Sequence, residues 1–152
     1  HLRRGEKTRH VAMDSFYTGQ KQNVLKPGEF IEAIELPKPV RGHRFHAHKV
    51  SKRFEQDISA TCCALHYRVV KGVLKDVRLA YNGLTPWPAR APKIEAVLEG
   101  RTPGEVTPQA LDAAIAASFT PRDGLRATWA YRALIARNLV LQFLESAAEE
   151  TV

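Results

Sequence analysis

Residues 61–81 carry the pattern that most constrains this fold, which is two runs of alternating side chains separated by a tight turn. The face expected to be buried holds Thr61, Cys63, Leu65, Tyr67 and Val69 in the first run and Val73, Lys75, Val77, Leu79 and Tyr81 in the second. A period of two residues is that of a β-strand, and the intervening Val70-Lys71-Gly72 is typical of a hairpin turn. The sequence therefore predicts an antiparallel strand pair with one buried face.

Helical signals follow this hairpin. Residues 91–98 precede Gly100, which indicates a short helix with glycine at its C-terminal side. Thr107 and Pro108 suit the N-cap and the first position of a second helix. A long third helix is expected from about Leu125 to about Ala147. The apolar positions expected on the last two helices are Leu111, Ala114, Ile115, Ser118 and Phe119, then Leu134, Ile135, Leu139, Val140, Phe143 and Leu144.

Strands followed by helices, without strict alternation, predict an α+β fold, with an antiparallel sheet, helices packed on one face and a long C-terminal helix. Pro37-Lys-Pro-Val-Arg-Gly42 is rich in turn-forming residues and predicts a linker between a first section, residues 1–39, and a second, residues 43–152. Within the first section, Phe30–Leu36 is short and bounded by Gly28 and Pro37, which favours a strand. Because the chain opens at His1 without an initiator Met, we expect it to be part of a longer protein.

Composition narrows the class of partner. The formal net charge is +7, but the basic residues are scattered and interrupted by acids, so we expect no nucleic-acid partner. No apolar run approaches the roughly 20 residues that span a bilayer, so we expect no membrane partner. Cys62 and Cys63 are adjacent in a strand pattern and point to opposite faces, which fits a reducing compartment and predicts a cytoplasmic protein.

A charged segment precedes the first strand of the hairpin. Five charged side chains lie within nine residues: Lys49, Lys52, Arg53, Glu55 and Asp57. From Ile58 onward the chain becomes apolar. This segment therefore predicts a polar loop at the mouth of a buried element, where it could meet the polar groups of a ligand.

Motifs for common chemistries are missing or incomplete. The sequence contains neither G-x-G-x-x-G nor a Walker lysine motif, and no G-x-S-x-G nucleophile elbow. His43, His46 and His48 are close enough to suggest zinc, but no further ligand follows at a suitable spacing, so we interpret them as solvated strand residues and keep a metal-binding module as an alternative. For Arg132 we expect an ion pair with a carboxylate such as Asp123, which holds the last helix on the domain, and a ligand contact through Tyr131 and Arg132 is the alternative.

Three blocks of sequence carry a family resemblance. They are Lys49-Val-Ser-Lys-Arg-Phe-Glu-Gln-Asp-Ile-Ser-Ala60, Val77-Arg-Leu-Ala-Tyr-Asn-Gly-Leu-Thr-Pro-Trp-Pro-Ala-Arg-Ala91, and Asp123-Gly-Leu-Arg-Ala-Thr-Trp-Ala-Tyr-Arg132 with Ala136-Arg-Asn-Leu139. In order and spacing they resemble the C-terminal part of the FAD-containing region of molybdenum hydroxylases, above all the small subunits of the xanthine dehydrogenase type. Pro27–Pro37 resembles the closing strand of the FAD-binding subdomain that precedes this part. The family usually has two glycines where Asn82-Gly83 stands and often a glycine at the position of Cys63.

The resemblance implies that residues 1–39 are the C-terminal remnant of the FAD-binding subdomain and that residues 43–152 are a domain like the C-terminal domain of CO dehydrogenase flavoproteins. It also implies a function in electron exit. In the family, a purine is hydroxylated at a molybdenum centre in the partner subunit, and electrons pass through two [2Fe–2S] clusters to FAD and then to NAD⁺. The phosphate-binding loops, the clusters and the molybdopterin belong to segments other than this chain, so we expect the isolated chain to be inactive and to bind FAD weakly or not at all.

Lys49 is the residue to which the resemblance assigns a direct role, because it matches the family lysine near the isoalloxazine ring. A cation there could stabilise negative charge on the reduced flavin. Arg53, Glu55 and Asp57 are expected to shape the loop, and Ile58 to anchor it in the core. The alternatives are a flavoprotein subunit of the CO or aldehyde dehydrogenase type, and a basic interaction module without enzymatic activity.

Overall fold

The computed structural model describes residues 1–53 and 58–149. Contacts divide the chain into two compact units, residues 1–40 and residues 41–152. Each unit is described by itself below. The assignment of the first unit to an FAD-binding subdomain stays a prediction from the resemblance.

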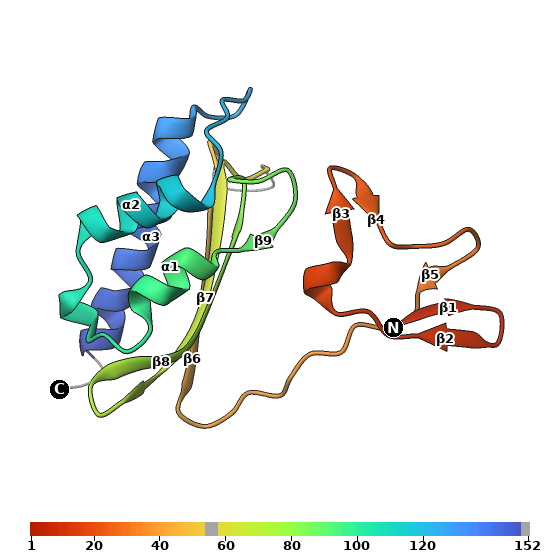
Figure 1. The fold of residues 1–152 in the computed structure, drawn as a ribbon, viewed down its shortest axis with the longest axis horizontal. Helices are drawn as coiled ribbons and strands as arrows, with labels where there is room; N and C mark the ends of the chain where they lie inside the picture. The colour runs from red at the N-terminus through yellow and green to blue at the C-terminus, as the bar shows by residue number, and fades with distance from the viewer. Residues whose placement is uncertain (54–57, 150–152) are drawn as a thin grey trace. The chain divides into compact units, whose positions relative to one another are not determined.

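The first unit consists of short strands (Figure 1). One sheet has the order β2-β1-β5 and a second pairs β3 with β4. The elements are β1 (Leu2–Arg4), β2 (Lys7–Arg9), the 3₁₀ helix η1 (Met13–Ser15), β3 (Tyr17–Gly19), β4 (Gln22–Asn23) and β5 (Phe30–Ile31). The strand predicted over residues 30–36 thus forms only at its first two residues. Nearby, hydrogen bonds from Arg9 and from the Lys26 backbone lower the pKa of Glu29 to about 2.

The second unit is built on a four-stranded antiparallel sheet with the order β6-β7-β8-β9. Its strands are β6 (His43–Val50), β7 (Thr61–Val70), β8 (Val73–Asn82) and β9 (Ala89–Arg90). Lys71 and Gly72 join β7 to β8 with φ of 51° and 79°. Two successive positive φ angles are those of the type I′ turn, which matches the twist of the two strands. The predicted hairpin is confirmed.

A β-bulge changes which residues of β8 face the core. Arg68 pairs with Lys75 and His66 with Arg78, so two residues, Asp76 and Val77, stand opposite Tyr67. The extra residue shifts the alternation by one position. In consequence Leu74 is 1% exposed, whereas Lys75, which the strict period of two places on the buried face, is half-buried. The prediction of which β8 residues are buried is therefore wrong before the bulge. After the bulge it is confirmed, at Val77, Leu79 and Tyr81.

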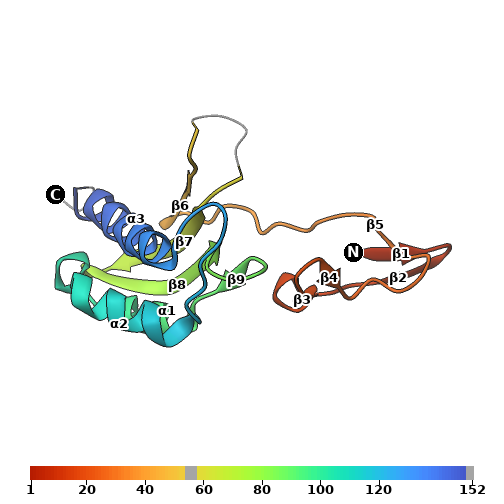
Figure 2. The same cartoon turned by 90° about the horizontal axis from the view of Figure 1, so that it is seen from above.

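Three α-helices cover one face of this sheet (Figures 1 and 2). They are α1 (Pro92–Leu98), α2 (Pro108–Ser118) and α3 (Trp129–Glu149), and a 3₁₀ helix, η2 (Pro103–Glu105), lies between α1 and α2. As the spacing predicts, Thr107 caps α2, because its Oγ1 accepts a hydrogen bond from the Ala110 backbone N–H at 3.2 Å. The long helix begins at Trp129 rather than near Leu125. Asp123 Oδ1 accepts from the Trp129 N–H at 2.6 Å and so satisfies one of the free donors at the helix start.

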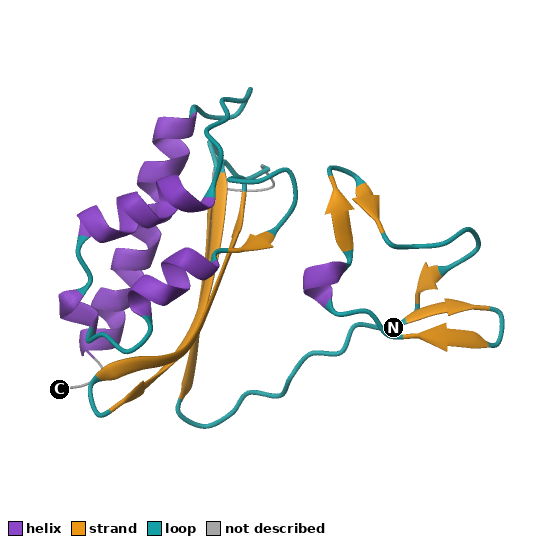
Figure 3. Ribbon diagram, in the orientation of Figure 1, coloured by secondary structure: helices purple, strands orange, loops and turns teal. Residues whose placement is uncertain are grey.

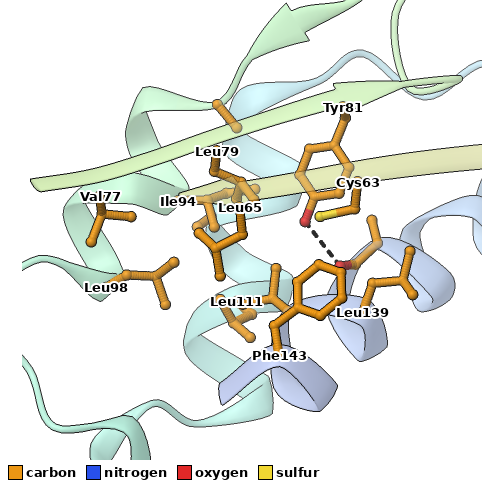
Figure 4. Packing of buried hydrophobic residues seen from close by; sticks show 14 of the residues in the cluster. Cys63, Leu65, Val77, Leu79, Tyr81, Ile94, Leu98, Leu111, Leu139 and Phe143 are labelled. Carbon is orange, nitrogen blue, oxygen red and sulfur yellow. Dashed lines mark hydrogen bonds between the residues drawn. The ribbon is translucent and has the colours of Figure 1, made fainter. Parts of the chain in front are cut away.

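The distribution of elements in Figure 3 confirms the predicted α+β class with a long C-terminal helix. The core of the second unit lies between the sheet and the helices (Figure 4). Its centre holds Leu65, Leu79, Ile94, Leu111 and Val140, each at most 1% exposed. The buried Tyr81 hydroxyl donates to the Ala136 carbonyl at 2.9 Å, which ties β8 to α3.

Two glutamates, Glu95 in α1 and Glu99 at the C-terminal cap of that helix, cover the outer edge of β8. Glu99 accepts hydrogen bonds from the backbone N–H groups of Asp76 at 3.3 Å and Val77 at 3.0 Å, at the bulge. One turn earlier, Glu95 accepts from the Leu79 N–H at 2.8 Å and from Arg90 Nε at 2.9 Å. An edge strand otherwise presents unpaired donors that can recruit another chain. Here the helix carboxylates take the place of a neighbouring strand.

Within residues 1–53 and 58–149, no helix has both the length and the apolar character needed to cross a membrane.

Candidate functional site

Lys49 lies near the end of β6, on the sheet face opposite the helices. Its cross-strand partner is Cys62 of β7, and Cys62 in turn pairs with Asn82 of β8. Directly paired residues share a face of the sheet. The side chain of Lys49 is exposed and that of Cys62 is half-buried. The row Lys49–Cys62–Asn82 is therefore the immediate surroundings of the predicted site residue.

The next row on this open face is made of alanines. Ala47 of β6 pairs with Ala64 of β7, and Ala64 pairs with Ala80 of β8. Arg90 of β9 pairs with Ala80 and ends the row. Three methyl side chains side by side leave a flat area of sheet beside Lys49. We call Ala47, Ala64 and Ala80 the alanine row.

Electrostatics differ between the two cysteines. Burial raises the pKa of the Cys62 thiol, and the positive charge of Lys49 acts in the opposite direction. Burial raises the pKa of Cys63 to about 12, and Cys63 faces the core next to Tyr81. The charge of Lys49 thus affects the pKa of Cys62, whereas Cys63 packs in the core as a small apolar side chain.

The backbone holds the end of β6 in a defined position. The Ala60 N–H donates to the Val50 carbonyl at 2.8 Å, which closes the base of the segment between β6 and β7. Gly83, with φ of 97°, lies so close to the backbone of Ala60 that a Cβ added to it would be 2.3 Å from the Ala60 oxygen. Arg132 donates to the Gly83 carbonyl at 2.6 Å. The helix α3, the turn after β8 and the strand that carries Lys49 are therefore linked through consecutive contacts.

Several expectations about neighbouring residues need correction. Ile58, expected to anchor the loop in the core, is 66% exposed, and Ala60 is the buried residue instead. Arg53 is exposed, and its carbonyl accepts from Ser51 Oγ at 2.7 Å. Glu55 and Asp57 lie outside the described residues. The predicted roles of the loop charges stay predictions.

Arg132 and Asp123 make different contacts from those expected. Arg132 binds the Gly83 carbonyl, and Asp123 accepts from the Trp129 N–H. The predicted ion pair between them is wrong in this respect, although Arg132 does connect the last helix to the domain. The backbone carbonyl that it contacts is 49 positions away, which no local pattern could indicate.

The three histidines of β6 take different roles. His46 is packed between the rings of Tyr67 and Phe143, and its Nε2 lies 3.0 Å from the Tyr67 hydroxyl. His43 Nδ1 lies 3.0 Å from Nε2 of His66 in β7. The expectation of solvated histidines therefore holds for the exposed His48 alone. Among the described residues, no three His, Cys, Asp or Glu side chains are grouped as a metal site requires.

The residues that lie beside Lys49 on the neighbouring strands were not predicted from the sequence. The period of two assigns Cys62 and Ala64 to the face opposite the core, but it does not reveal which residues of β6 and β8 lie beside them. That information is the strand register. Cys62, Asn82 and the alanine row become candidate site residues only once the register is known.

Comparison with known proteins identifies the second unit. Residues 46–147 match the family model of the CO dehydrogenase flavoprotein C-terminal domain. The chain is similar to xanthine dehydrogenase/oxidase of Gallus gallus, with 33% identity over 99 residues, or 63% of this chain and 7% of that protein. The chain thus spans a small part of this curated relative.

Solved structures show the same likeness over more of the chain. A Cu,Mo-CO dehydrogenase in its cyanide-inactivated form matches with a TM-score of 0.80 and 25% identity, over 93% of this chain and 49% of that chain. The carbon monoxide dehydrogenase of Hydrogenophaga pseudoflava that lacks the Mo-pyranopterin moiety matches with a TM-score of 0.72 and 28% identity, over 85% and 45%. The chain belongs to the CO dehydrogenase flavoprotein C-terminal domain family, whose relatives include xanthine and CO dehydrogenases.

Proposed function

We propose that this chain forms one wall of the flavin site in a molybdenum hydroxylase of the xanthine dehydrogenase type, with Lys49 as the cation of that wall. The observation that carries the proposal is the position of Lys49 beside the alanine row on the sheet face that the helices leave open. Family membership supports the same assignment.

The residues on this face fit one side of a flavin. The isoalloxazine ring is planar, and the methyl groups of the alanine row allow a planar ring to approach the strands. FAD would supply the electron-transfer chemistry, and the protein would supply binding, orientation and electrostatics. Lys49, which pairs with Cys62 in the adjoining row, would stand at the edge of the ring.

Lys49 would act through its charge. A nearby ammonium favours whichever state of a partner is more negative, so it would favour the reduced, anionic form of a flavin. Exposed charges are screened by water and salt, and exclusion of water by the rest of the flavin site would strengthen the effect. The backbone contacts of Val50 and Ala60 would keep the Lys49 strand end at a constant distance from the ring.

The remainder of the parent enzyme supplies what this chain lacks. We propose that electrons reach the flavin from a molybdenum-binding partner subunit through [2Fe–2S] clusters, that NAD⁺ accepts them, and that xanthine or hypoxanthine is the substrate. The similarity to xanthine dehydrogenase/oxidase supports this choice. The two free cysteines fit a cytoplasmic location. A flavoprotein of the CO dehydrogenase type is the second candidate, favoured by the TM-score of 0.80.

Replacing Lys49 by alanine in the complete enzyme tests the proposal. We expect the flavin reduction potential to become more negative and the rate of NAD⁺ reduction to change, while purine hydroxylation with an artificial acceptor that bypasses the flavin continues at the original rate. Redox titration and the two steady-state assays measure these quantities.

The matched control is Lys52→Ala, which removes the same charge from an exposed position three residues away. We expect a smaller shift of the potential in this variant. An unchanged potential and unchanged NAD⁺ turnover in Lys49→Ala would show that Lys49 has no role at the flavin. Absence of purine turnover in the wild-type enzyme, with activity on CO, would favour the second candidate.

A further inference from the structure

A buried pair of residues lies directly behind the row that carries Lys49. Val50 and Thr61 are the next paired residues of β6 and β7 after Lys49 and Cys62. Successive residues of a strand point to opposite faces, so this pair faces the helices. Thr61 is fully buried, and Val50 packs against the core. The backbone of this pair therefore fixes where the end of β6 that carries Lys49 lies.

The turn after β8 packs closely on the start of β7. A Cβ added to Gly83 would lie 2.3 Å from the Ala60 oxygen and 3.2 Å from the Thr61 Cα. Asn82, the residue before this glycine, pairs with Cys62 on the open face of the sheet. The Gly83 turn thus contacts the backbone behind the site and continues, through Asn82, into the row that contains Lys49.

Arg132 holds this turn from α3. Its Nη1 donates to the Gly83 carbonyl at 2.6 Å, and a Cβ added to Gly124 would lie 2.9 Å from its Nη2. The guanidinium is therefore enclosed between the Gly83 turn and the loop before α3. Because α3 covers the sheet face opposite to Lys49 (Figure 2), Arg132 approaches the strands from behind the site. It contacts the backbone that supports the site and not the open face itself.

Two buried polar atoms beside this turn have no hydrogen-bond partner among residues 1–53 and 58–149. They are Nε of Arg132 and Oγ1 of Thr61. A buried polar atom without a partner destabilises the folded state, and an apolar side chain that packs equally well is often no worse for stability than a buried charge. Residues that break such rules are expected at functional sites. The stability of the fold alone therefore does not account for an arginine at this position.

We propose that Arg132 is a positioning residue for Lys49, which it keeps in place on the open face by holding the Gly83 turn against the start of β7. The Ala60 N–H, which donates to the Val50 carbonyl at 2.8 Å, carries this constraint from β7 to the end of β6. The inference deepens the proposed function and, as far as the flavin is concerned, rests on it. The position of Lys49 relative to Cys62, however, can be measured in this chain without FAD.

The reactivity of Cys62 in the 152-residue chain reports the position of Lys49, because the charge of Lys49 acts on the pKa of this thiol. The test variant is Arg132→Met, which keeps an unbranched side chain and removes the donor to Gly83. If Lys49 moves away from Cys62, the thiolate fraction falls, and we expect alkylation by iodoacetamide at pH 8 to slow about twofold or more. Mere loosening of the fold would act in the opposite direction, because it would expose the half-buried thiol.

A double-mutant cycle shows whether Arg132 acts through Lys49. In the Lys49→Ala background, we expect Arg132→Met to change the Cys62 rate by less than about 1.3-fold, because the cation whose position matters is gone. The conservative variant Arg132→Lys keeps a charged donor and is expected to react at a rate closer to wild type than Arg132→Met.

The matched control is Arg137→Met on the same helix. Arg137 Nη1 donates to Asp112 Oδ2 of α2 at 3.0 Å, so this variant removes a contact of α3 that does not involve the Gly83 turn. We expect the Cys62 rate of the control to equal that of the wild-type chain.

The complete enzyme separates this inference from the proposed function. We expect Arg132→Met to shift the flavin reduction potential in the same direction as Lys49→Ala, and to leave purine hydroxylation with the artificial acceptor intact. A slower, Lys49-dependent Cys62 reaction, with an unchanged potential in both variants, would support the positioning of Lys49 by Arg132 and overturn the role of Lys49 at the flavin.

Two results would overturn the inference itself. An unchanged or faster Cys62 reaction in Arg132→Met would show that Arg132 does not set the position of Lys49. Equal effects of Arg132→Met with and without Lys49 would assign Arg132 to the stability of the fold alone. If Arg132→Met does not fold, as judged by circular dichroism, the shorter, uncharged and polar Arg132→Gln takes its place in the cycle, with the same expected and contradicting results.

Discussion

At the scale of single residues, the charge of Lys49 affects the thiol pKa of Cys62, its partner on the neighbouring strand. Burial raises the pKa of the Cys62 thiol, and the positive charge of Lys49 offsets part of that increase. The thiolate is the reactive form of cysteine. A change at Lys49 should therefore be visible as a change in Cys62 reactivity, whether or not a flavin is bound.

We predict that Lys49→Ala slows the alkylation of Cys62 by iodoacetamide at pH 8, because loss of the cation raises the thiol pKa and reduces the thiolate fraction. Mass spectrometry of quenched samples measures the rate. Cys63, with a pKa of about 12 and a buried side chain, is expected to react only after unfolding. Lys75→Ala is the control, and the same Cys62 rate in wild type and Lys49→Ala would contradict the assigned proximity.

Gly83 and Gly72 form a matched pair for testing the contact beneath Lys49. Both have positive φ, 97° and 79°, but a Cβ at Gly83 would meet the Ala60 oxygen at 2.3 Å, whereas at Gly72 it would meet nothing within 4 Å. We predict that Gly83→Ala lowers the free energy of unfolding by about 3 kcal/mol or more. Gly72→Ala is expected to lower it by about 1 kcal/mol. Urea denaturation followed by circular dichroism distinguishes these values, and equal losses would refute the contact.

At the scale of elements, α1 serves the sheet as an edge cover through its side chains. Glu95 is 8% exposed and accepts from both the Leu79 backbone and Arg90. We predict that Glu95→Ala lowers the free energy of unfolding by about 2–4 kcal/mol, since it leaves a buried N–H and the Arg90 guanidinium without this acceptor. Glu145→Ala, at an exposed position of α3, is the control, and we expect a change within about 0.5 kcal/mol. A similar small loss in both variants, measured by urea denaturation, would show that the carboxylate does not support the edge.

At the scale of the whole molecule, the main hydrophobic core belongs entirely to the second unit. All its buried members lie between Cys63 and Ala147. We predict that a chain of residues 41–152 folds cooperatively, with a thermal midpoint within about 3 °C of the midpoint of the same unit in the longer chain, because no core residue is removed. Thermal melts and amide spectra of both chains provide the measurement. A molten spectrum of the shorter chain would show that residues 1–40 are needed for this core.

The sequence alone determined those features that depend on neighbours a few positions apart. These are the hairpin with its Lys71-Gly72 turn, the Thr107 cap, the helical stripes and the family resemblance, which pointed to Lys49 as the site residue. Each arises from local φ/ψ preferences, side-chain periodicity or a contiguous motif. The stripe of the last helix is wrong at Leu134, which is 45% exposed, whereas Ala136 is fully buried. The α+β class followed from their order along the chain.

Only the tertiary structure decided what stands beside Lys49. The pairing of Lys49 with Cys62, the alanine row, the contact of Arg132 with Gly83 and the bulge that buries Leu74 in place of Lys75 join residues from separate strands and helices. Strand register and helix packing are set by the combined free energy of the whole core, and a one-residue change of register moves every side chain to the other face. For that physical reason a period of two could identify a strand face, but not the partners that make it a site.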